Sequence, residues 1–442
     1  MASDECDSKN VEASAKSSVP ARRGYRIPKR YFMVLGMFLL AVLLYVDRAC
    51  ISSSKASIVA ELGLTDKQMG WIFSIFALSY ALFQLPSGIL SDRFGPRLIL
   101  SGVVTFWSIF TALTGLARGF ISMLAYRFLF GAGEAGAYPG CARAVYSWIP
   151  MSERGAVQGV TFSGGRFGLA FALPVVAWMV SRFGWRTCFL VLGLIGIAWA
   201  VFWYFWFRNT PETHPRISAA EKDHICRTRQ EASATASDEP RLTAGRLFGS
   251  GTVWLLMWQY FCCNFTFFFC LSWLFPYFQS RFKLEMAQTG FYVMLPPLAG
   301  AFGNWAAGGL IDWIYRRGRW NLSRQAPAIA GLALSAGGLI ASVFMTTPLA
   351  SIAFLSIAIF GADMTLAPSW TVCIDIGRRN SGTVSSTMNM AGNFGSFVTS
   401  LAFPYLLAWT GTNNTFFIVG AVLNVTAIAA WLFTRSDRHL GE

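Results

Sequence analysis

Long apolar runs, separated by short polar stretches, occupy most of this 442-residue chain. A helix of about 20 residues crosses the ~30 Å hydrocarbon core of a bilayer, and twelve of the runs are close to or above that length. They lie near residues 31–54, 69–90, 98–117, 121–148, 157–180, 187–207, 253–278, 288–314, 326–346, 349–374, 383–409 and 415–434. The pattern therefore predicts an all-α membrane protein with twelve transmembrane helices.

One polar connection is much longer than the others and divides the predicted helices into two groups of six. We interpret this connection as a plain tether. The predicted organisation is a disordered cytoplasmic N-terminus (1–30), an N-terminal six-helix bundle (31–207), a cytoplasmic linker (208–250), a C-terminal six-helix bundle (251–434) and a cytoplasmic tail (435–442).

Positive charges are distributed unevenly between the two sides of this topology. If the N-terminus is inside, residues 22–30, the even-numbered connections and the C-terminal tail contain 23 Lys and Arg residues, and the opposite side contains seven. Cytoplasmic loops of membrane proteins carry such an excess. We therefore expect a multi-pass protein of the inner (plasma) membrane with both termini in the cytoplasm.

The composition excludes several other classes of protein. The chain is 54% hydrophobic and only 13% charged, and its net charge of +14 comes from basic residues in short loops, so nucleic acid is not the expected partner. The nine Cys residues show no metal-ligand spacing and no disulfide framework, and the three His residues lie in loops or the tail. We expect no cofactor and no metal, and a monomer that contacts membrane lipid.

Besides Arg143, six charged residues lie well inside the predicted spans, where a charge costs at least ~2.5–3.5 kcal/mol. An arginine stays charged and offers a planar fork that matches a carboxylate, whereas a buried acid can bind and release a proton. The arginines suit an anionic substrate and the acids suit proton transfer. The six are Asp47, Arg48, Arg127, Glu134, Arg166 and Asp363.

Each of these charges also has a purely structural interpretation. Arg127 and Glu134 share one face of the fourth predicted helix, about 10 Å apart along its axis, and could form an ion pair that joins two helices. Asp47 and Arg48 lie late in their span and could reach the interface as a pair. Asp363 could stabilise a helix end.

The two halves of the chain repeat each other in outline. Gly88-x-x-x-Asp92 ends the second predicted span, and Gly308-x-x-x-Asp312 ends the eighth. Spans four and ten carry matching acid-to-proline spacings, and the repeat aligns Arg166 of span five with Asn393 of span eleven. Internal repeats of this kind are typical of secondary transporters, which bind substrate between the repeats.

The segment Gly88-Ile-Leu-Ser-Asp92-Arg93-Phe-Gly95-Pro-Arg97 closely resembles the signature loop of the major facilitator superfamily. That resemblance implies the major facilitator fold, two pseudo-symmetric six-helix bundles, with this loop as a conformational latch between them. The implied latch residues are Gly88, Asp92, Arg93, Gly95, Arg97 and, from the second repeat, Asp312.

Further motifs resemble the anion:cation symporter family, which includes bacterial hexuronate, galactonate and glucarate permeases and vesicular glutamate and sialic acid carriers. The motifs are Tyr45-Val-Asp47-Arg48, Tyr80-x-x-x-Gln84-x-Pro86-x-Gly88, Arg127 through Glu134 to Pro139, Glu153-Arg154-Gly155, Gly184-Trp185-Arg186, and Asn389 with Asn393. The resemblance implies that Arg48 and Tyr80 bind substrate, that Asp47 and Glu134 carry protons, and that Asn393 completes the site.

Together these observations predict a transporter that imports a sugar acid or a related small organic anion with protons. The candidate substrate-binding residues are Arg48, Tyr80, Arg166, Trp370, Asn389 and Asn393, and the candidate proton-coupling residues are Asp47, Glu134, Arg127 and Asp363. The alternatives are a sodium-coupled or uncoupled anion carrier, a membrane enzyme and an efflux pump for lipophilic compounds. The predicted spans contain no catalytic constellation, which disfavours the enzyme, and their arginines disfavour the efflux pump.

Arg166 allows two interpretations. It departs from the uncharged polar residue expected at this place in sugar-acid permeases. If it contacts substrate, two arginines would hold the ligand, and anions with two acidic ends would be favoured. If it instead neutralises Glu134 or Asp363, it would never contact substrate.

The topology can be tested with single cysteines in a background without native cysteines. A cysteine at Ser237 should react with an impermeant thiol reagent only from the cytoplasm, and one at Ala56 only from outside, because the charge bias places these loops on opposite sides. Labelling of both from one side would contradict the twelve-span topology.

Overall fold

The computed structural model describes residues 27–229, 242–437 and 440, and the described residues form helices joined by short turns. Each of the twelve predicted spans coincides with helix. The helices of the first half are α1 (Lys29–Ser53), α2 (Lys55–Leu62), α3 (Asp66–Phe94), α4 (Pro96–Thr114), α5 (Phe120–Glu134), α6 (Ala137–Trp148) and α7 (Arg154–Trp206).

The second half repeats this arrangement with shorter pieces. Its helices are α10 (Gly251–Ser272), α11 (Leu274–Phe282), α12 (Met286–Val293), α13 (Leu295–Tyr315), α14 (Trp320–Phe344), α15 (Pro348–Asp363), α16 (Leu366–Gly377), α17 (Ser381–Thr410) and α18 (Asn414–Phe433). Predicted spans four, seven, eight and ten are therefore each built from two consecutive helices rather than one.

The structure agrees with one predicted boundary and changes another. The element α7 consists of two helices that meet at a sharp turn at Gly184, where φ is 77°, between predicted spans five and six. The fourth span is broken after Glu134, between α5 and α6. Among the described residues, eight helical segments are long and apolar enough to cross a membrane by length and composition alone. Predicted spans four, five and eight contain no segment that meets these criteria among the described residues.

The outer faces of both halves are apolar. Phe205, Phe344 and Trp409 are 69%, 73% and 84% exposed, and they belong to a large set of exposed aromatic and aliphatic side chains. Water disfavours such a surface, whereas lipid tails accommodate it. The helices therefore form a multi-pass membrane protein.

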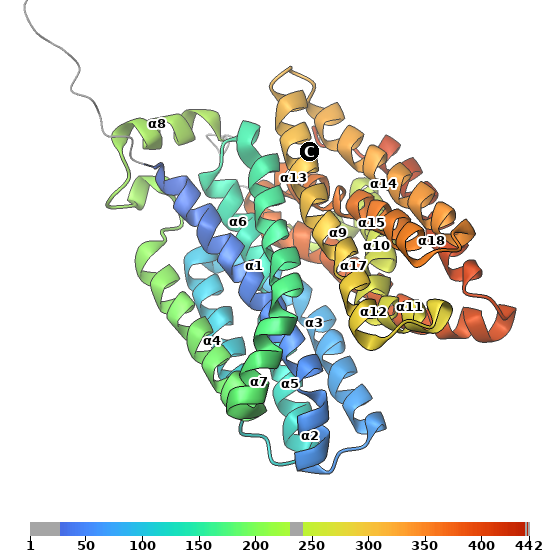
Figure 1. The fold of residues 1–442 in the computed structure, drawn as a ribbon. Coiled ribbons are helices and arrows are strands. Elements are labelled where there is room, and N and C mark those ends of the chain that lie inside the picture. The colour runs from blue at the N-terminus through green and yellow to red at the C-terminus, as the bar shows by residue number, and fades with distance from the viewer. Residues whose placement is uncertain (1–26, 230–241, 438–439, 441–442) are drawn as a thin grey trace, which may run out of the picture.

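The halves meet along two pairs of helices, α3 with α17 and the first part of α7 with α13. Figure 1 shows the two halves close together near the end that carries α8 (Ala219–Thr228) and diverging toward the end that carries α2 and α11. We call these the α8 end and the α2 end. The cross-half hydrogen bonds described below lie between the middle of the molecule and the α8 end, so the protein is closed at the α8 end.

The predicted linker is more than a plain tether over its described part. Its helix α8 buries Ile225, and Glu221 accepts hydrogen bonds from the backbone N–H groups of Lys29 and Arg30 at 2.9 and 3.0 Å. These N–H groups open α1 and have no partner within that helix. The linker thus caps the first helix of the first bundle. Ser237, and nearly all of the predicted disordered N-terminus, lie outside the described residues.

Burial also affects a histidine in this linker. His214 lies edge-on to the rings of Trp148 and Trp206, at 5.5 and 5.6 Å between ring centroids. Burial lowers the pKa of His214, and the nearby cations Arg208 and Lys29 lower it further. His214 is therefore neutral at pH 7 and packs as an aromatic ring.

Gly88 allows the close approach of α3 and α17. A Cβ atom at this position would overlap the Ser386 hydroxyl and the carbonyl oxygen of Gly382, both on α17. Gly88→Ala should therefore disfavour the arrangement closed at the α8 end by about 1–3 kcal/mol. Spin labels on exposed Arg93 and Arg317, one in each half, should report a longer distance in the variant.

Gly102→Ala is the matched control, because a Cβ atom there would meet no heavy atom within 4 Å. The control should keep the wild-type distance distribution. An unchanged distribution in Gly88→Ala would contradict the role of this contact.

Candidate functional site

Asp92 joins the two halves at the α8 end. Its carboxylate, at the end of α3, accepts hydrogen bonds from the backbone N–H groups of Gly382 and Thr383 at 2.9 and 2.7 Å, and from the Thr383 hydroxyl at 2.7 Å. These groups lie in the first turn of α17. A helix N-terminus has unpaired N–H groups and a partial positive charge, so it favours a carboxylate.

Asp312 makes the corresponding contact from the other half. Its carboxylate accepts from the N–H groups of Gly155 and Ala156 at 3.0 and 2.9 Å, in the first turn of α7. The two acids that the sequence repeat matched therefore occupy equivalent positions.

The remaining predicted latch residues lie within one half. Arg97 donates to the carbonyl oxygen of Tyr204 at 2.8 Å, and exposed Arg93 lies over the ring of Phe94. Gly95 adopts φ 80°, which lets the chain turn between α3 and α4. These residues shape the loop, whereas Asp92 and Gly88 form the contact between the halves.

Sequence reasoning missed a buried charge cluster that also crosses the halves. Arg154 of α7 donates to Asp375 of α16 at 2.6 Å, and Arg324 of α14 donates to the same carboxylate at 3.0 Å. Trp320 adds a third donor at 3.3 Å. Asp375 directly follows the tenth predicted span, so it counted as a loop residue and not as one of the charges inside the spans.

Arg48 and Glu134 form an ion pair within the first half. Arg48 Nε lies 3.1 and 3.0 Å from the two Glu134 carboxylate oxygens. The Arg48 guanidinium lies 4.8, 5.2 and 5.3 Å from the ring centroids of Tyr80, Phe76 and Tyr45. The Glu134 side chain is fully buried and the Arg48 side chain is 24% exposed, so Arg48 is the accessible member of the pair.

Asp47 and Arg127 lie deeper in the same half. Both carboxylate oxygens of Asp47 are buried and make no hydrogen bond. Arg127, buried to 2% exposure, lies 4.3 and 5.1 Å from the rings of Phe130 and Phe76, and its Nε has no hydrogen-bond partner. The sequence placed Arg127 and Glu134 on one helix, and both belong to α5.

Arg166 pairs with Asp363 across the two halves. Arg166 Nε and Nη2 each lie 2.6 Å from one of the two Asp363 carboxylate oxygens, and Nη1 donates to the Tyr45 hydroxyl at 3.1 Å. The ring of Phe267 lies 3.5 Å from the guanidinium. Of the two partners that the sequence left open for Arg166, Asp363 holds it in this conformation.

Three more candidate residues meet at the α3–α17 contact. Asn389 donates to Gln84 at 3.1 Å across the halves, and Asn393 donates to the Asn389 carbonyl oxygen at 2.8 Å. Tyr80 lies on α3 beside Asn389 and over Arg48. Arg48, Tyr80 and the two asparagines therefore lie close together.

Trp370 is buried in an aromatic cluster between the halves. Its ring lies 5.6 and 5.4 Å from Tyr138 and Phe162 of the first half, and its indole N–H donates to Tyr260 at 2.9 Å. Only 1% of Trp370 is exposed. Trp370 is therefore covered in this conformation, and a ligand would contact it only after the neighbouring rings move.

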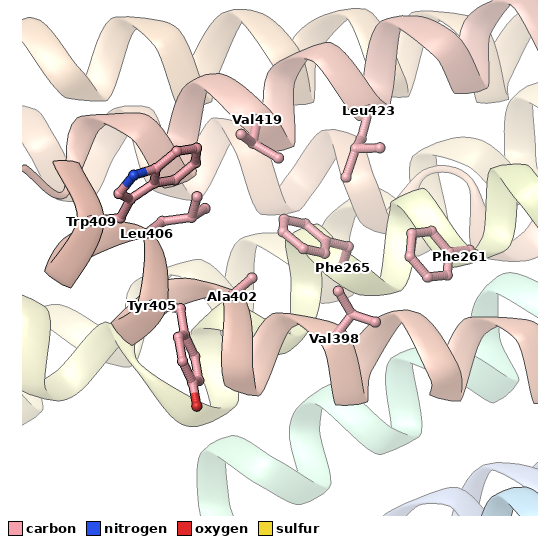
Figure 2. Close-up of a pocket in the computed structure, with 9 residues that line it drawn as sticks. All are labelled: Phe261, Phe265, Val398, Ala402, Tyr405, Leu406, Trp409, Val419 and Leu423. Carbon is pink, nitrogen blue, oxygen red and sulfur yellow. The ribbon is translucent and has the colours of Figure 1, made fainter.

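An apolar groove of about 540 Å³ lies elsewhere, between α10, α17 and α18 (Figure 2). Its lining includes Phe261 and Phe265 and contains no charged residue. Tyr405 and Trp409 at its edge are 72% and 84% exposed on the lipid-facing side. This groove therefore lacks the chemistry to bind an anion.

The residues around Arg48 and Arg166 have the chemistry of a binding site. Among the described residues no group of three or more His, Cys, Asp or Glu side chains could hold a metal ion. The site instead offers paired arginines and acids, amides and phenols. Such a set can recognise an anion and can exchange protons.

Comparison with known proteins gives a consistent result. The family model described as Major Facilitator Superfamily matches residues 37–400. The chain is 34% identical to a probable sulfoacetate transporter of Cupriavidus necator over 92% of this chain and 94% of the relative. It is 31% identical to a probable galactarate/D-glucarate transporter of Bacillus subtilis, covering 92% of each chain. It is 30% identical to a probable L-galactonate transporter of Escherichia coli, covering 90% and 87%.

Two solved structures share the fold. The proton:xylose symporter XylE has a TM-score of 0.74 at 15% identity, covering 93% of this chain and 98% of that chain. The transporter FucP has a TM-score of 0.69 at 14% identity, covering 91% and 98%.

The Arg166–Asp363 pair makes a prediction about stability. Arg166→Gln should lower the free energy of unfolding by about 3–5 kcal/mol, because it leaves a buried carboxylate without its cation. The double variant Arg166→Gln/Asp363→Asn should lose clearly less, since no charge is then left buried. Denaturant unfolding in detergent measures both, and Arg118→Gln, at an exposed loop position, should stay within about 0.5 kcal/mol. Additive losses in the double variant would contradict the pairing.

Proposed function

The chain belongs to the major facilitator superfamily, and on that premise we propose that it imports a sugar acid or related small organic anion by proton symport and alternating access. The relatives and the solved structures described above are transporters, so this chain is a transporter and not an enzyme. Three relatives are named as transporters of sulfoacetate, galactarate/D-glucarate and L-galactonate, all of which are organic anions.

One observation carries the anion proposal. Arg48 is the partly exposed member of a buried ion pair, and three aromatic rings surround its guanidinium. Its Nη2 atom has no hydrogen-bond partner. A carboxylate that reaches Arg48 gains charge-assisted hydrogen bonds there. Tyr80, Asn389 and Asn393 nearby offer hydrogen bonds to hydroxyl groups.

The two acids beside Arg48 and Arg127 support proton coupling. An ionised carboxylate without a partner is very costly to bury, so Asp47 is the acid that we expect to hold a proton in this conformation. Glu134 is held by Arg48 and is released when a substrate carboxylate takes its place. Substrate binding and protonation of Glu134 would thereby favour each other.

Alternating access would use the contacts at the α8 end. We propose that this end is cytoplasmic, in agreement with the charge bias, and that the structure represents an outward-facing state. Asp92, Asp312 and the Arg154–Asp375–Arg324 cluster would then separate when the protein opens inward. The protein would act as a monomer, because one chain supplies both halves.

The coupling proposal is tested in proteoliposomes. Asp47→Asn and Glu134→Gln should each abolish accumulation of substrate driven by a pH gradient, while exchange of internal for external substrate remains measurable. The amides keep the shape of the acids but cannot carry a proton. Asp223→Asn, at a linker position with a 57% exposed side chain, is the control and should accumulate substrate like the wild type.

Accumulation by both variants would refute the proton assignment. The second candidate mechanism is sodium-coupled or uncoupled transport. Wild-type uptake that follows a sodium gradient, or that is equal with and without a pH gradient, would favour this candidate.

A further inference from the structure

Two arginine–carboxylate pairs lie close to one tyrosine. The guanidinium carbons of Arg48 and Arg166 lie 5.3 and 5.8 Å from the ring centroid of Tyr45. Glu134 holds Arg48 and Asp363 holds Arg166. A single small molecule bound over this ring can therefore reach both cations.

The two pairs differ in how much of the arginine is available. Arg48 uses only Nε on Glu134, its side chain is 24% exposed, and its Nη2 is buried without a hydrogen-bond partner. Arg166 uses Nε and Nη2 on Asp363 and Nη1 on Tyr45. The carboxylate-matching edge of Arg166 is thus occupied, so a second acid can bind there only by displacing Asp363.

The third arginine of the first half does not offer an equivalent place. Arg127 is 2% exposed and its guanidinium lies against the rings of Phe130 and Phe76. Its main acidic neighbours, Glu134 and Asp47, both belong to the same half. Arg166, in contrast, already binds a carboxylate from the opposite half.

The surroundings of Asp363 would accept the neutral acid. The phenol of Tyr45, bound to the same arginine, and the thiols of Cys263 and Cys270 on α10 also lie near the pair. Gly300 of α13, which has no side chain, packs against the Asp363 carboxylate. With Arg166 withdrawn, the described surroundings would leave the ionised form of Asp363 without a cation, so its displacement requires a proton.

We propose that the preferred substrates are small dianions, with one acidic group on Arg48 and the second replacing Asp363 on Arg166. Asp363 then takes up one proton and becomes a neutral acid, and the guanidinium keeps one anionic partner throughout. The exchange breaks the ion pair that joins the halves at this depth. This inference rests on the proposed function and specifies its substrate class.

The test uses galactarate and L-galactonate, which share a carbon skeleton and differ at one end, a carboxylate in the first and a hydroxymethyl group in the second. Calorimetry on the purified protein should give at least about 10-fold tighter binding of galactarate, because the second carboxylate gains charge-assisted hydrogen bonds. Titration in buffers of different ionisation enthalpy should show about one more proton taken up with galactarate than with L-galactonate.

Variants separate a binding role from a structural one. Arg166→Gln should weaken galactarate binding about 10-fold or more and L-galactonate binding by less than about 3-fold. Asp363→Asn should abolish the extra proton taken up with galactarate. Arg118→Gln is the surface control and should change neither. Should Arg166→Gln fail to fold, Asp363→Asn and the double variant still report the proton difference.

Three results would overturn the inference. They are equal proton uptake for the two probes, equal loss of both in Arg166→Gln, and wild-type binding of monoanions without binding of galactarate or sulfoacetate. In each of these cases the proposed transport of an organic anion would stand. If no organic anion binds the wild-type protein, the proposed function itself fails.

Discussion

The cost of holding a charge away from water governs the interior of this protein. In a bilayer core an unpaired charge is expensive, so buried ions pair with each other or with helix ends. The structure follows this constraint at the Arg48–Glu134 pair, the Arg166–Asp363 pair and the Asp92 contact with α17. Each pairing fixes the position of a helix, so the same charges that define the site also determine how the halves meet.

The pairings fall into two kinds with different consequences. Those within one half, such as Arg48 with Glu134, move with that half as a body. Those between halves, such as Arg166 with Asp363 and Arg154 with Asp375, depend on how the two halves are placed relative to each other. A bound molecule that displaces one partner of a cross-half pair and supplies a replacement charge can therefore shift the equilibrium between two conformations. It does so without leaving a buried charge unpaired.

The fold could be predicted from the sequence because its signals are local. The length of the apolar runs predicted the spans, and the matched motifs at Gly88 and Gly308 predicted the internal repeat. Asp92 and Asp312 make equivalent contacts between the halves, in agreement with that repeat. Partner choice could not be predicted in the same way. Nothing local connects Arg166 with Asp363, 197 residues away, or Asp375 with its two arginines, which come from other helices. The breaks that follow Glu134 and Asp363 in spans four and ten were not predicted, because the apolar runs continue on both sides of these acids.

The reciprocity of the Asp92 and Asp312 contacts bears on how such a molecule could arise. Each half carries both kinds of partner, an acid at the end of one helix and the backbone N–H groups in the first turn of another. This is the self-complementary form of an isologous two-fold interface. A single six-helix half would therefore contain all that is needed to form both contacts with a second copy of itself, and fusion of two such copies, followed by divergence of residues such as Arg166 and Asn393, is a sufficient origin for the present asymmetric site.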